Sequence, residues 1–267
     1  MTTSNDIIQT RIDDRGAAGR VAYVTVNNPE RRNTLGMPGK TAIAETFRQL
    51  AKDDGLRVAV ITGAGDKSFI AGADIAEMRD LGADEALREH TLTHVANESI
   101  RALPVPVIAR VNGWCLGFGM ELAAACDMRI GVDTSKFGMP EVRVGIPSGM
   151  EANLLPALIG WGKTMELIFT GDIIDAQEAY RIGFLQKLIA SSELDAAVEK
   201  MVSSILLGGP RAIRLQKPLT RDWERMSVTD GIWQGIRACV AARDTDEPKR
   251  MMQAFMDRKH NTPAQRG

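Results

Sequence analysis

The stretch that most constrains the fold runs from Val105 to Val132, where an apolar segment, a pair of glycines and a helical segment follow one another. The apolar run Val105–Ala109 lies beside prolines, a pattern that predicts a buried strand. Gly117-Phe118-Gly119 then leads into Met120–Cys126, whose residues favour helix. Glycine permits the sharp turn and the close backbone approach that such a strand-to-helix crossing needs. The stretch therefore predicts a buried strand that turns tightly into a helix.

The start of this predicted helix is a candidate site for negative charge. Backbone N–H groups at a helix start have no helical partner, and the helix dipole favours anions there. Glu121 falls in the first turn, beside whatever those N–H groups hold. The pattern also has an ordinary explanation, since the dipole favours a glutamate in a first turn without any chemistry. Only the rest of the chain decides between the two interpretations.

Charge and composition exclude several classes of protein. Hydrophobic residues make up 44% of the 267 residues and charged residues 25%, which is enough for a sizeable buried core. Lys plus Arg number 33 against 34 Asp plus Glu, for a net charge of -1. This balance provides no basic footprint for nucleic acid and no polybasic membrane anchor. We therefore expect neither nucleic acid nor a membrane as a partner.

The cysteines and the N-terminus predict a cytoplasmic protein. Cys115, Cys126 and Cys239 lack metal-ligand spacing and cannot all pair, which is typical of small core residues in a reducing compartment. The first residues carry neither a basic segment nor an apolar one, and no run reaches the ~18 apolar residues that a membrane span needs. His90 and His94 are spaced i, i+4 but lack further ligands, so we expect them to be solvated and expect no metal.

The order of elements predicts an α/β fold followed by an all-helical region. Strands are expected at 7–12, 21–26, 58–62, 105–109, 128–132 and 184–189, with helices between them at 41–51, 85–102 and 120–126. After residue 191 only helical segments remain, at 192–207, 211–217, 222–242 and 247–258, separated by glycines and prolines that include Pro218. Alternation favours largely parallel pairing. We therefore divide the chain into a core, 1–191, and a helical region, 192–267.

Three turns carry a resemblance to a known family. They are Ala71–Ile75, Gly117–Glu121 and Met139–Val142, and they are accompanied by Asn28-Pro29 and by a terminal Phe-Xaa-Xaa-Arg. In this order and spacing the motifs resemble the enoyl-CoA hydratase/isomerase (crotonase) family, over about Ile7 to Lys259. The resemblance implies a crotonase-like spiral of ββα repeats. It also implies a C-terminal helical region that builds trimers, often paired into hexamers.

The resemblance assigns catalytic roles to four residues. Ala73 and Phe118 match the two positions whose backbone N–H groups form the oxyanion hole for a thioester carbonyl. The second position is often glycine in the family, but a main-chain donor permits phenylalanine. Glu121 and Glu141 match the two carboxylates that hold and activate water in the hydratases. Taken without the motif, Glu141 after a proline would be an ordinary turn residue.

The resemblance also assigns substrate contacts. Arg31 and Arg32 lie in the loop that contacts coenzyme A in the family, and Arg258 matches a basic residue supplied by a neighbouring subunit. Three arginines in exposed loops and a terminal helix are otherwise unremarkable. The predicted substrate-binding set is completed by residues of the first two turns, namely Ala71, Asp74, Ile75 and Gly117.

Two departures from the family pattern bear on the reaction. Ala76 stands where the family often has a lysine near the adenine end of coenzyme A. The turn after Glu141 is one residue shorter than usual and reads Pro147-Ser148-Gly149-Met150-Glu151, which narrows the pocket floor and adds a third carboxylate. Glu151 is interpreted first as a charge at a helix start. The alternative is that it changes which reaction the site performs.

We conclude from the sequence that the chain is an enoyl-CoA hydratase acting on a 2-enoyl-CoA thioester, as a homotrimer or homohexamer. No cofactor is implied, because coenzyme A is part of the substrate. Within the fold, the alternatives are an isomerase and a hydrolase or lyase on a functionalised acyl-CoA. Family isomerases usually keep only the carboxylate that Glu141 matches, so Glu121 is the discriminating residue. Outside enzymes, the alternative is a non-catalytic member that binds acyl-CoA or RNA.

Overall fold

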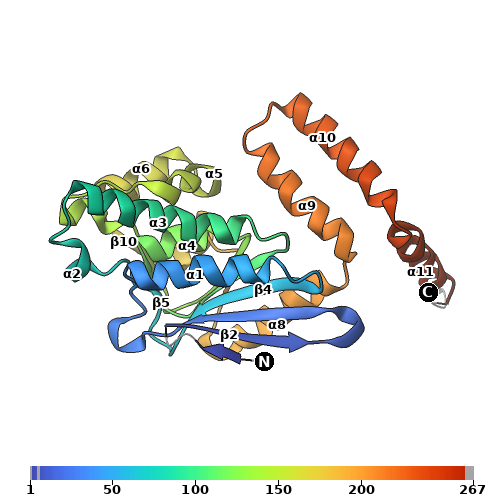
Figure 1. The fold of residues 1–267 in the computed structure, drawn as a ribbon, viewed down its shortest axis with the longest axis horizontal. Helices are drawn as coiled ribbons and strands as arrows, with labels where there is room; N and C mark the ends of the chain where they lie inside the picture. Colours follow the sequence, from blue (N-terminus) through green and yellow to red (C-terminus); the bar gives the residue numbers. More distant parts are fainter. Residues whose placement is uncertain (1, 5–6, 262–267) are drawn as a thin grey trace. The chain divides into compact units, whose positions relative to one another are not determined.

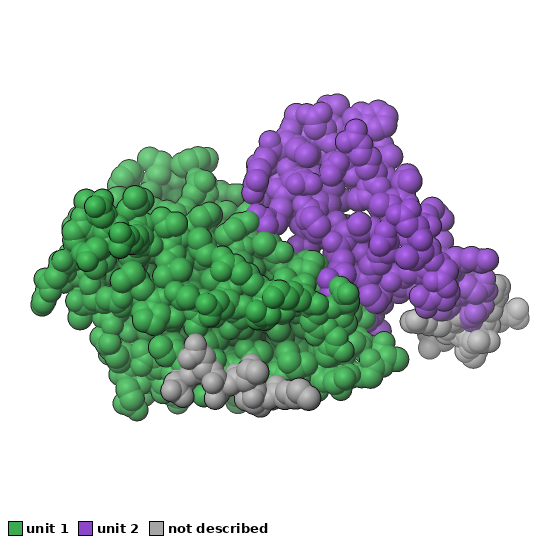
Figure 2. Space-filling view, viewed as in Figure 1, with its two compact units in different colours: residues 1–203 green, residues 204–267 purple. Residues whose placement is uncertain are grey.

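The computed structural model describes the backbone of residues 2–4 and 7–261 and the side chains of residues 7–257. The chain forms two compact units, residues 1–203 and 204–267, which Figure 2 colours separately. The division falls inside helix α8 (Leu194–Leu206), whereas the boundary predicted at 191/192 precedes this helix.

A seven-stranded sheet forms the base of the first unit. Its order is β1-β2-β3-β4-β6-β8-β11, and all neighbours from β3 to β11 are parallel, whereas β1, β2 and β3 pair antiparallel. The strands are β1 (Thr2–Ser4), β2 (Ile8–Asp14), β3 (Arg20–Val26), β4 (Leu56–Gly63), β6 (Val107–Val111), β8 (Met128–Val132) and β11 (Lys187–Ile189). The six predicted strands and the parallel pairing are confirmed, although β6 lies two residues later than predicted and β1 was not predicted. β11 begins three residues later than the predicted strand. Phe184, the first residue of the predicted strand, lies outside it, and its carbonyl accepts a hydrogen bond from Arg129 Nε at 2.7 Å.

One face of this sheet carries the main hydrophobic core. Successive strand residues point to opposite faces, and alternate residues of β3, such as Ala22, Val24 and Val26, belong to the core. Helices α1 (Met37–Leu50), α3 (Ala83–Arg101) and α4 (Phe118–Ala125) lie over the sheet in Figure 1, and Phe47 and Ile100 from α1 and α3 are fully buried. The three predicted helices are therefore confirmed, and they cover one face of the sheet.

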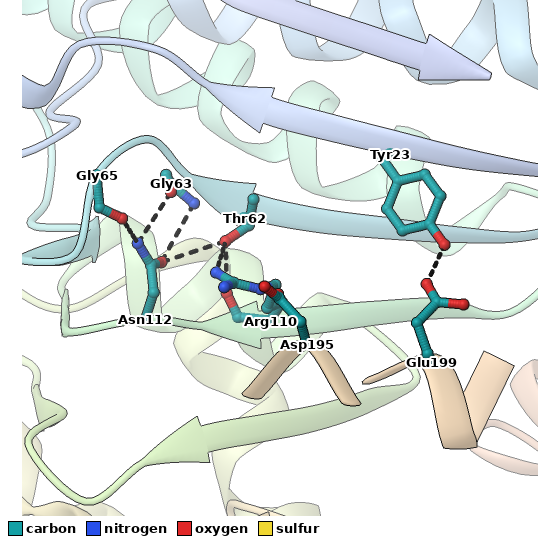
Figure 3. A network of polar contacts seen from close by, with 8 residues as sticks. All are labelled: Tyr23, Thr62, Gly63, Gly65, Arg110, Asn112, Asp195 and Glu199. Atoms are coloured by element: carbon teal, nitrogen blue, oxygen red, sulfur yellow. Dashed lines mark hydrogen bonds and ion pairs between the residues drawn. The ribbon is translucent and has the colours of Figure 1, made fainter. Parts of the chain in front are cut away.

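The other face of the sheet meets α8, and it adds polar contacts to buried apolar residues such as Val58 and Val198. Figure 3 shows Tyr23 of β3 directed toward Glu199 and Arg110 of β6 directed toward Asp195, both acids coming from α8. Arg110 Nε donates to Asp195 Oδ1 at 2.8 Å, and the Tyr23 hydroxyl contacts the Glu199 carboxylate. These contacts tie the last helix of the first unit to the sheet.

Asn112, just after β6, fixes the loop that leads from the first sheet to the second. Its Nδ2 donates to Gly63 O at 2.9 Å and to Gly65 O at 2.7 Å, as Figure 3 shows. Because one amide group holds two carbonyls of the same loop, the chain leaves β4 in a single direction. That loop enters the second sheet at β5.

The second sheet has the order β10-β9-β7-β5, with β5, β7 and β9 parallel and β10 antiparallel to β9. The strands are β5 (Ser68–Ile70), β7 (Trp114–Leu116), β9 (Lys136–Gly138) and β10 (Ile173–Asp175), none of which the sequence analysis predicted. Each of the three parallel strands runs directly into one of the three motif turns. Since the carboxyl ends of neighbouring parallel strands meet at one edge, this small sheet brings the turns together.

Short helices complete the first unit. They are α2 (Ile75–Met78), α5 (Leu155–Ile159), α6 (Trp161–Thr170) and α7 (Ala176–Arg181), with 3-10 turns η1 (Gly16–Ala18), η2 (Pro29–Arg31), η3 (Pro140–Val144), η4 (Met150–Leu154) and η5 (Ser191–Glu193). Two of these carry acids of interest: η3 overlaps the third motif turn and contains Glu141, and η4 follows it and contains Glu151.

The second unit is helical in the part that the structure describes. It contains α9 (Pro210–Trp223), α10 (Val228–Ala241), η6 (Ala242–Asp244) and α11 (Glu247–Asn261). The predicted break at Pro218 is wrong, because α9 continues through it to Trp223. An internal proline forfeits one helical hydrogen bond. Beyond it, the Trp223 indole N–H donates to Gly231 O at 3.1 Å and anchors the end of α9 to α10.

Candidate active site

A cavity of about 490 Å³ opens where the three motif turns meet. Ala73 from the first turn, Gly117 and Phe118 from the second and Glu141 from the third all line it. Glu121, one helical turn into α4, lines the same cavity. The four residues predicted to be catalytic therefore share one cavity, although they come from separate parts of the sequence.

The second turn is shaped by its glycines. Gly117 has φ +50, a left-handed conformation that glycine adopts readily. A side chain on Gly119 would overlap the carbonyl of Ile70, at the end of β5. Helix α4 therefore begins at Phe118, two residues before the predicted start, and it packs directly on the strand that leads to Ala73. As the first residue of the helix, Phe118 has a backbone N–H without an acceptor inside the helix.

The first turn pairs with Leu35 without using the N–H of Ala73. An isolated parallel bridge joins Leu35 and Ala73. Its bonds run from Leu35 N to Gly72 O at 3.3 Å and from Asp74 N to Leu35 O at 3.2 Å. Because these bonds use the amides on either side, the bridge holds the Ala73 backbone in place without consuming its donor. The bridge thus leaves the Ala73 N–H without a partner of its own.

Glu121 is a buried acid. Its side chain is only 2% exposed, and Oε1 accepts a hydrogen bond from Ala152 N at 3.3 Å. Burial, together with the negative charges of Glu141 and Glu151, raises the pKa of Glu121 to about 8. Glu121 is therefore protonated at neutral pH and can act as a proton donor.

Glu141 is held from two sides. Ser148 Oγ donates to Glu141 Oε2 at 2.7 Å, and the other carboxylate oxygen lies against Gly117 so closely that a side chain there would overlap it. The glycine of the second turn thus makes room for the acid of the third. The sequence analysis placed Ser148 only in the turn after Glu141, and its contact with that carboxylate was not predicted. No local pattern marks it, because the contact depends on how η3 and η4 fold back.

Glu151 is more than a charge at a helix start. It does lie in the first turn of η4, but it is 5% exposed and is held by α3. His94 Nδ1 lies 2.7 Å from Oε1, and Asn97 Nδ2 donates to Oε2 at 2.8 Å. The prediction that His94 is solvated is therefore incomplete, since one ring nitrogen is engaged while the side chain stays 57% exposed. Through its charge, Glu151 acts on the pKa of Glu121.

The predicted substrate-binding residues divide into two groups. Ala71, Ile75 and Gly117 line the cavity. Arg31 and Asp74 do not; they pair with each other, Nη1 to Oδ2, at 2.7 Å, and Asp74 also caps α2 by accepting from Ala76 N at 3.1 Å. Their contacts with coenzyme A stay a prediction.

The other two predicted arginines lie in different parts of the chain. Arg32 is exposed, has φ +53 and does not line the cavity. Arg258 belongs to α11, and its side chain lies outside the described residues. Both assignments stay predictions.

Sequence reasoning missed a pair of charged residues in the cavity wall. Lys40 of α1 and Glu89 of α3 are 1% and 2% exposed, and both line the cavity. No motif marks them, since a lysine and a glutamate on helices normally face water. Their pairing becomes visible only when α1 packs against α3.

In residues 2–4 and 7–261, no group of three or more His, Cys, Asp and Glu residues is placed to hold a metal ion. Within the same residues, no helix combines the length and the apolar character needed to cross a membrane.

Comparison with solved structures defines the fold class. The chain superimposes on an enoyl-CoA hydratase from Bacillus anthracis with a TM-score of 0.88 and 30% identity, covering 93% of this chain and 96% of that one. The α/β core with a C-terminal helical region is therefore a crotonase fold, as predicted.

Comparison of sequences establishes the family. Residues 16–265 match the family model Enoyl-CoA hydratase/isomerase. A crotonyl-CoA hydratase of Syntrophomonas wolfei is 36% identical over 241 residues, covering 90% of this chain and 93% of the relative. A short-chain-enoyl-CoA hydratase of Clostridium acetobutylicum is 34% identical over 242 residues, covering 90% and 93%. The chain belongs to the enoyl-CoA hydratase/isomerase family.

Proposed function

We propose that this protein adds water across the double bond of a 2-enoyl-CoA thioester. The observation that carries the proposal is that Glu121 and Glu141 line one cavity with the backbone of Ala73 and Phe118. Hydration needs backbone N–H donors for the thioester oxygen and carboxyl groups for the water.

The backbone groups supply the electrostatic part of the reaction. When water adds to the β-carbon, enolate charge develops on the thioester oxygen. The Ala73 N–H, left out of its bridge, and the Phe118 N–H, at the start of α4, are suited to stabilise that charge. Both donors belong to packed backbone, so they need no reorganisation during the reaction.

The glutamates supply the proton transfers. Glu141, held by Ser148 and Gly117, takes a proton from water as the water oxygen bonds to the β-carbon. Glu121, whose pKa is raised to about 8 by burial and by its acidic neighbours, returns a proton to the α-carbon. One proton leaves water and one enters the substrate, and a transfer between the two carboxyl groups restores the resting state. The product is a 3-hydroxyacyl-CoA.

Two further features support a hydratase over the alternatives. Relatives at 36% and 34% identity are named crotonyl-CoA hydratase and short-chain-enoyl-CoA hydratase. The presence of Glu121 inside the cavity argues against an isomerase, for which the carboxylate of Glu141 alone would serve. Coenzyme A then enters as part of the substrate, and the chemistry requires no separate cofactor.

The second unit supports assembly into a trimer or hexamer. Helix α10 exposes Val228, Trp233, Ile236 and Val240 at 82%, 58%, 46% and 64%, which is a large apolar surface for a single helix. We propose that neighbouring subunits cover it. Light scattering at micromolar concentration tests this, and a monomer would contradict it.

The experiment that tests the reaction is a panel of straight, branched and functionalised 2-enoyl-CoA thioesters. We expect loss of the enoyl absorbance with formation of the 3-hydroxyacyl-CoA, identified by mass and by chromatography against standards. A product with the mass of the substrate but a moved double bond would indicate an isomerase. Release of free coenzyme A would indicate a hydrolase. Either result as the main activity would refute the hydratase assignment.

A further inference from the structure

The backbone of Met150 is held in an unfavourable conformation beside the cavity. Its φ is +42, in the left-handed region where a residue with a side chain meets steric resistance. Of the three non-glycine residues with a positive φ in the described part of the chain, Met150 is the one that lines the cavity. Glycine would adopt the same φ without strain. A strained residue persists where its surroundings impose the conformation, and at a ligand site it points to a use for the side chain.

The segment that carries Met150 is fixed to both proposed catalytic acids. Ser148 Oγ, two residues before it, donates to Glu141 Oε2 at 2.7 Å. Ala152 N, two residues after it, donates to Glu121 Oε1 at 3.3 Å. Two residues span at most about 7 Å of extended chain, so Met150 lies near both contacts. It therefore adjoins the part of the cavity where the reacting carbons of a substrate must lie.

Glu151 attaches the same segment to α3. His94 Nδ1 lies 2.7 Å from Glu151 Oε1, and Asn97 Nδ2 donates to Oε2 at 2.8 Å. Thr93, the residue before His94, is 1% exposed and lines the cavity. Because α3 and η4 are in contact here, Met150 at the start of η4 lies beside the turn of α3 that forms the cavity wall.

Exposure distinguishes the two ends of the cavity. Ile75 and Val144 line one part and are 61% and 55% exposed. Lys40 and Glu89 line another part and are 1% and 2% exposed. The nucleotide of coenzyme A carries phosphates, whose burial is costly, so it belongs at the exposed end. The acyl chain then extends toward the buried end, which Met150 adjoins.

The wall at the buried end resists a longer chain. Lys40 Nζ contacts Glu89 Oε1 and donates to Thr93 Oγ1 at 2.7 Å. An alkyl chain that pushed between these groups would part buried charges, which costs far more than the burial of methylene groups gains. The adaptable boundary is therefore Met150, whose side chain is unbranched, uncharged and half-buried.

We propose that the side chain of Met150 closes the acyl end of the cavity, so that the protein prefers short, straight 2-enoyl-CoA thioesters to long ones. In this arrangement the side chain occupies the place where an acyl chain would continue beyond the β-carbon. This inference rests on the proposed hydratase function and specifies its substrate class. It assigns the choice of substrate to a residue that takes no part in the proton transfers.

The first test compares 2-enoyl-CoA thioesters of four, six, eight and ten carbons as substrates of the wild-type protein. We expect kcat/KM for the ten-carbon substrate to be about tenfold or more below that of the best shorter one, because a closed pocket rejects additional methylene groups. A value that stays level or rises with chain length would overturn the inference and leave the hydratase function standing. Hydration of none of the four would instead refute the proposed function.

Two variants then locate the limit. Met150→Ala removes the side chain beyond Cβ and keeps the strained backbone, whereas Met150→Gly removes the side chain and the strain. We expect both to raise the ratio of kcat/KM for the ten-carbon to the four-carbon substrate by about tenfold or more, since each methylene group that gains room is worth roughly fourfold. Taking a ratio cancels any loss of rate common to all substrates.

The matched control is Met165→Ala on α6, outside the cavity, which should keep the wild-type ratio. An unchanged ratio in both Met150 variants overturns the inference. A change confined to the glycine variant also overturns it, because the backbone and not the side chain would then set the limit.

A binding measurement on the wild-type protein keeps the test valid if the variants do not fold. Isothermal titration with saturated butanoyl-CoA and decanoyl-CoA separates the room in the cavity from the chemistry. In an open apolar cavity the additional methylene groups would favour the longer thioester. We expect decanoyl-CoA to bind no more tightly than butanoyl-CoA. Binding of decanoyl-CoA that is tighter by about tenfold or more would overturn the inference.

Discussion

Two charged pairs line the same cavity, and they differ in sign. Glu121 and Glu141 are like charges, whereas Lys40 and Glu89 are opposite charges. Between like charges, burial and repulsion raise a pKa, so that Glu121 keeps its proton up to about pH 8. Between opposite charges no proton needs to be shared, and what remains is a fixed dipole with one unbonded oxygen. The first arrangement is suited to move protons, whereas the second joins α1 to α3 in the cavity wall.

The largest effects are expected from the like-charged pair. Glu121→Gln and Glu141→Gln should each lower kcat for hydration by at least ~10², because each removes one of the two acid–base groups. Acyl-CoA binding should change much less, since the thioester oxygen is held by backbone. Steady-state kinetics and titration with a saturated acyl-CoA measure the two quantities. Glu166→Gln, on the exposed face of α6, is the control, and near-normal turnover in either cavity variant would remove that residue from the mechanism.

Phe118 lies between the two pairs, since its N–H is the proposed oxyanion donor and Lys40 Nζ lies over its ring. Phe118→Pro deletes the N–H at a helix position that tolerates proline, so the rate should fall on the order of 10²–10³ in a folded protein. Phe118→Gly keeps the N–H and should retain a large part of the activity, at a cost of roughly 0.5–1 kcal/mol in stability. Circular dichroism and subunit state separate misfolding from lost chemistry. Full activity of a folded proline variant would refute the oxyanion assignment.

A smaller loss is expected when the place of Glu141 is disturbed. Gly117→Ala puts a methyl group where Glu141 Oε1 now lies, so the carboxylate must move. A displaced carboxylate no longer lies at the correct distance from the reacting water, so kcat should fall about tenfold to a hundredfold. Gly160→Ala is the matched control, because Gly160 has φ +78 and open space around it, and therefore shares the backbone strain without the clash. Equal losses in both variants would mean that strain alone is responsible.

Removing the charge of the third carboxylate, Glu151, should shift the pH profile of kcat and change its maximal value only modestly. Glu151 raises the pKa of Glu121 by its negative charge, so Glu151→Gln should lower that pKa. If protonated Glu121 is the proton donor, the alkaline limb of kcat moves to lower pH in this variant. The measurement is kcat against pH on either side of 8 for the wild type and the variant. An alkaline limb that stays in place would separate Glu151 from the reaction.

The last effect is on folding and leaves the reaction itself unchanged. The pKa of Glu121 is about 8 in the folded protein and near 4.5 as a free group, so the folded state binds this proton more tightly. Its contribution to stability is fully present below pH 4.5 and is lost as pH rises through 8. Urea unfolding at several pH values should therefore show a decline across this range that Glu121→Gln reduces. An identical decline in the variant would place the titrating group elsewhere.

Local patterns predicted the elements better than their packing. Six of the seven strands of the large sheet, all but β1, and the helices α1, α3 and α4 were predicted from local patterns, which depend on near neighbours only. The second sheet has strands of only three residues in the motif region. They were missed because three residues are too few to show a periodic pattern. Pro218 was misread for a related reason, since the contact of Trp223 that steadies α9 is not local.

The sequence by itself determined the turn glycines, the glutamate in the first turn of α4 and the order of motifs that carries the family resemblance. Each depends on residue type and spacing along one segment. Only the tertiary structure decided that Glu121 is buried, that Ser148 and Gly117 hold Glu141, and that Lys40 meets Glu89. Desolvation and the field of distant charges exist only once separate segments are packed together. The raised pKa of Glu121 and the unbonded oxygen of Glu89 therefore belong to the fold and to no single stretch of the chain.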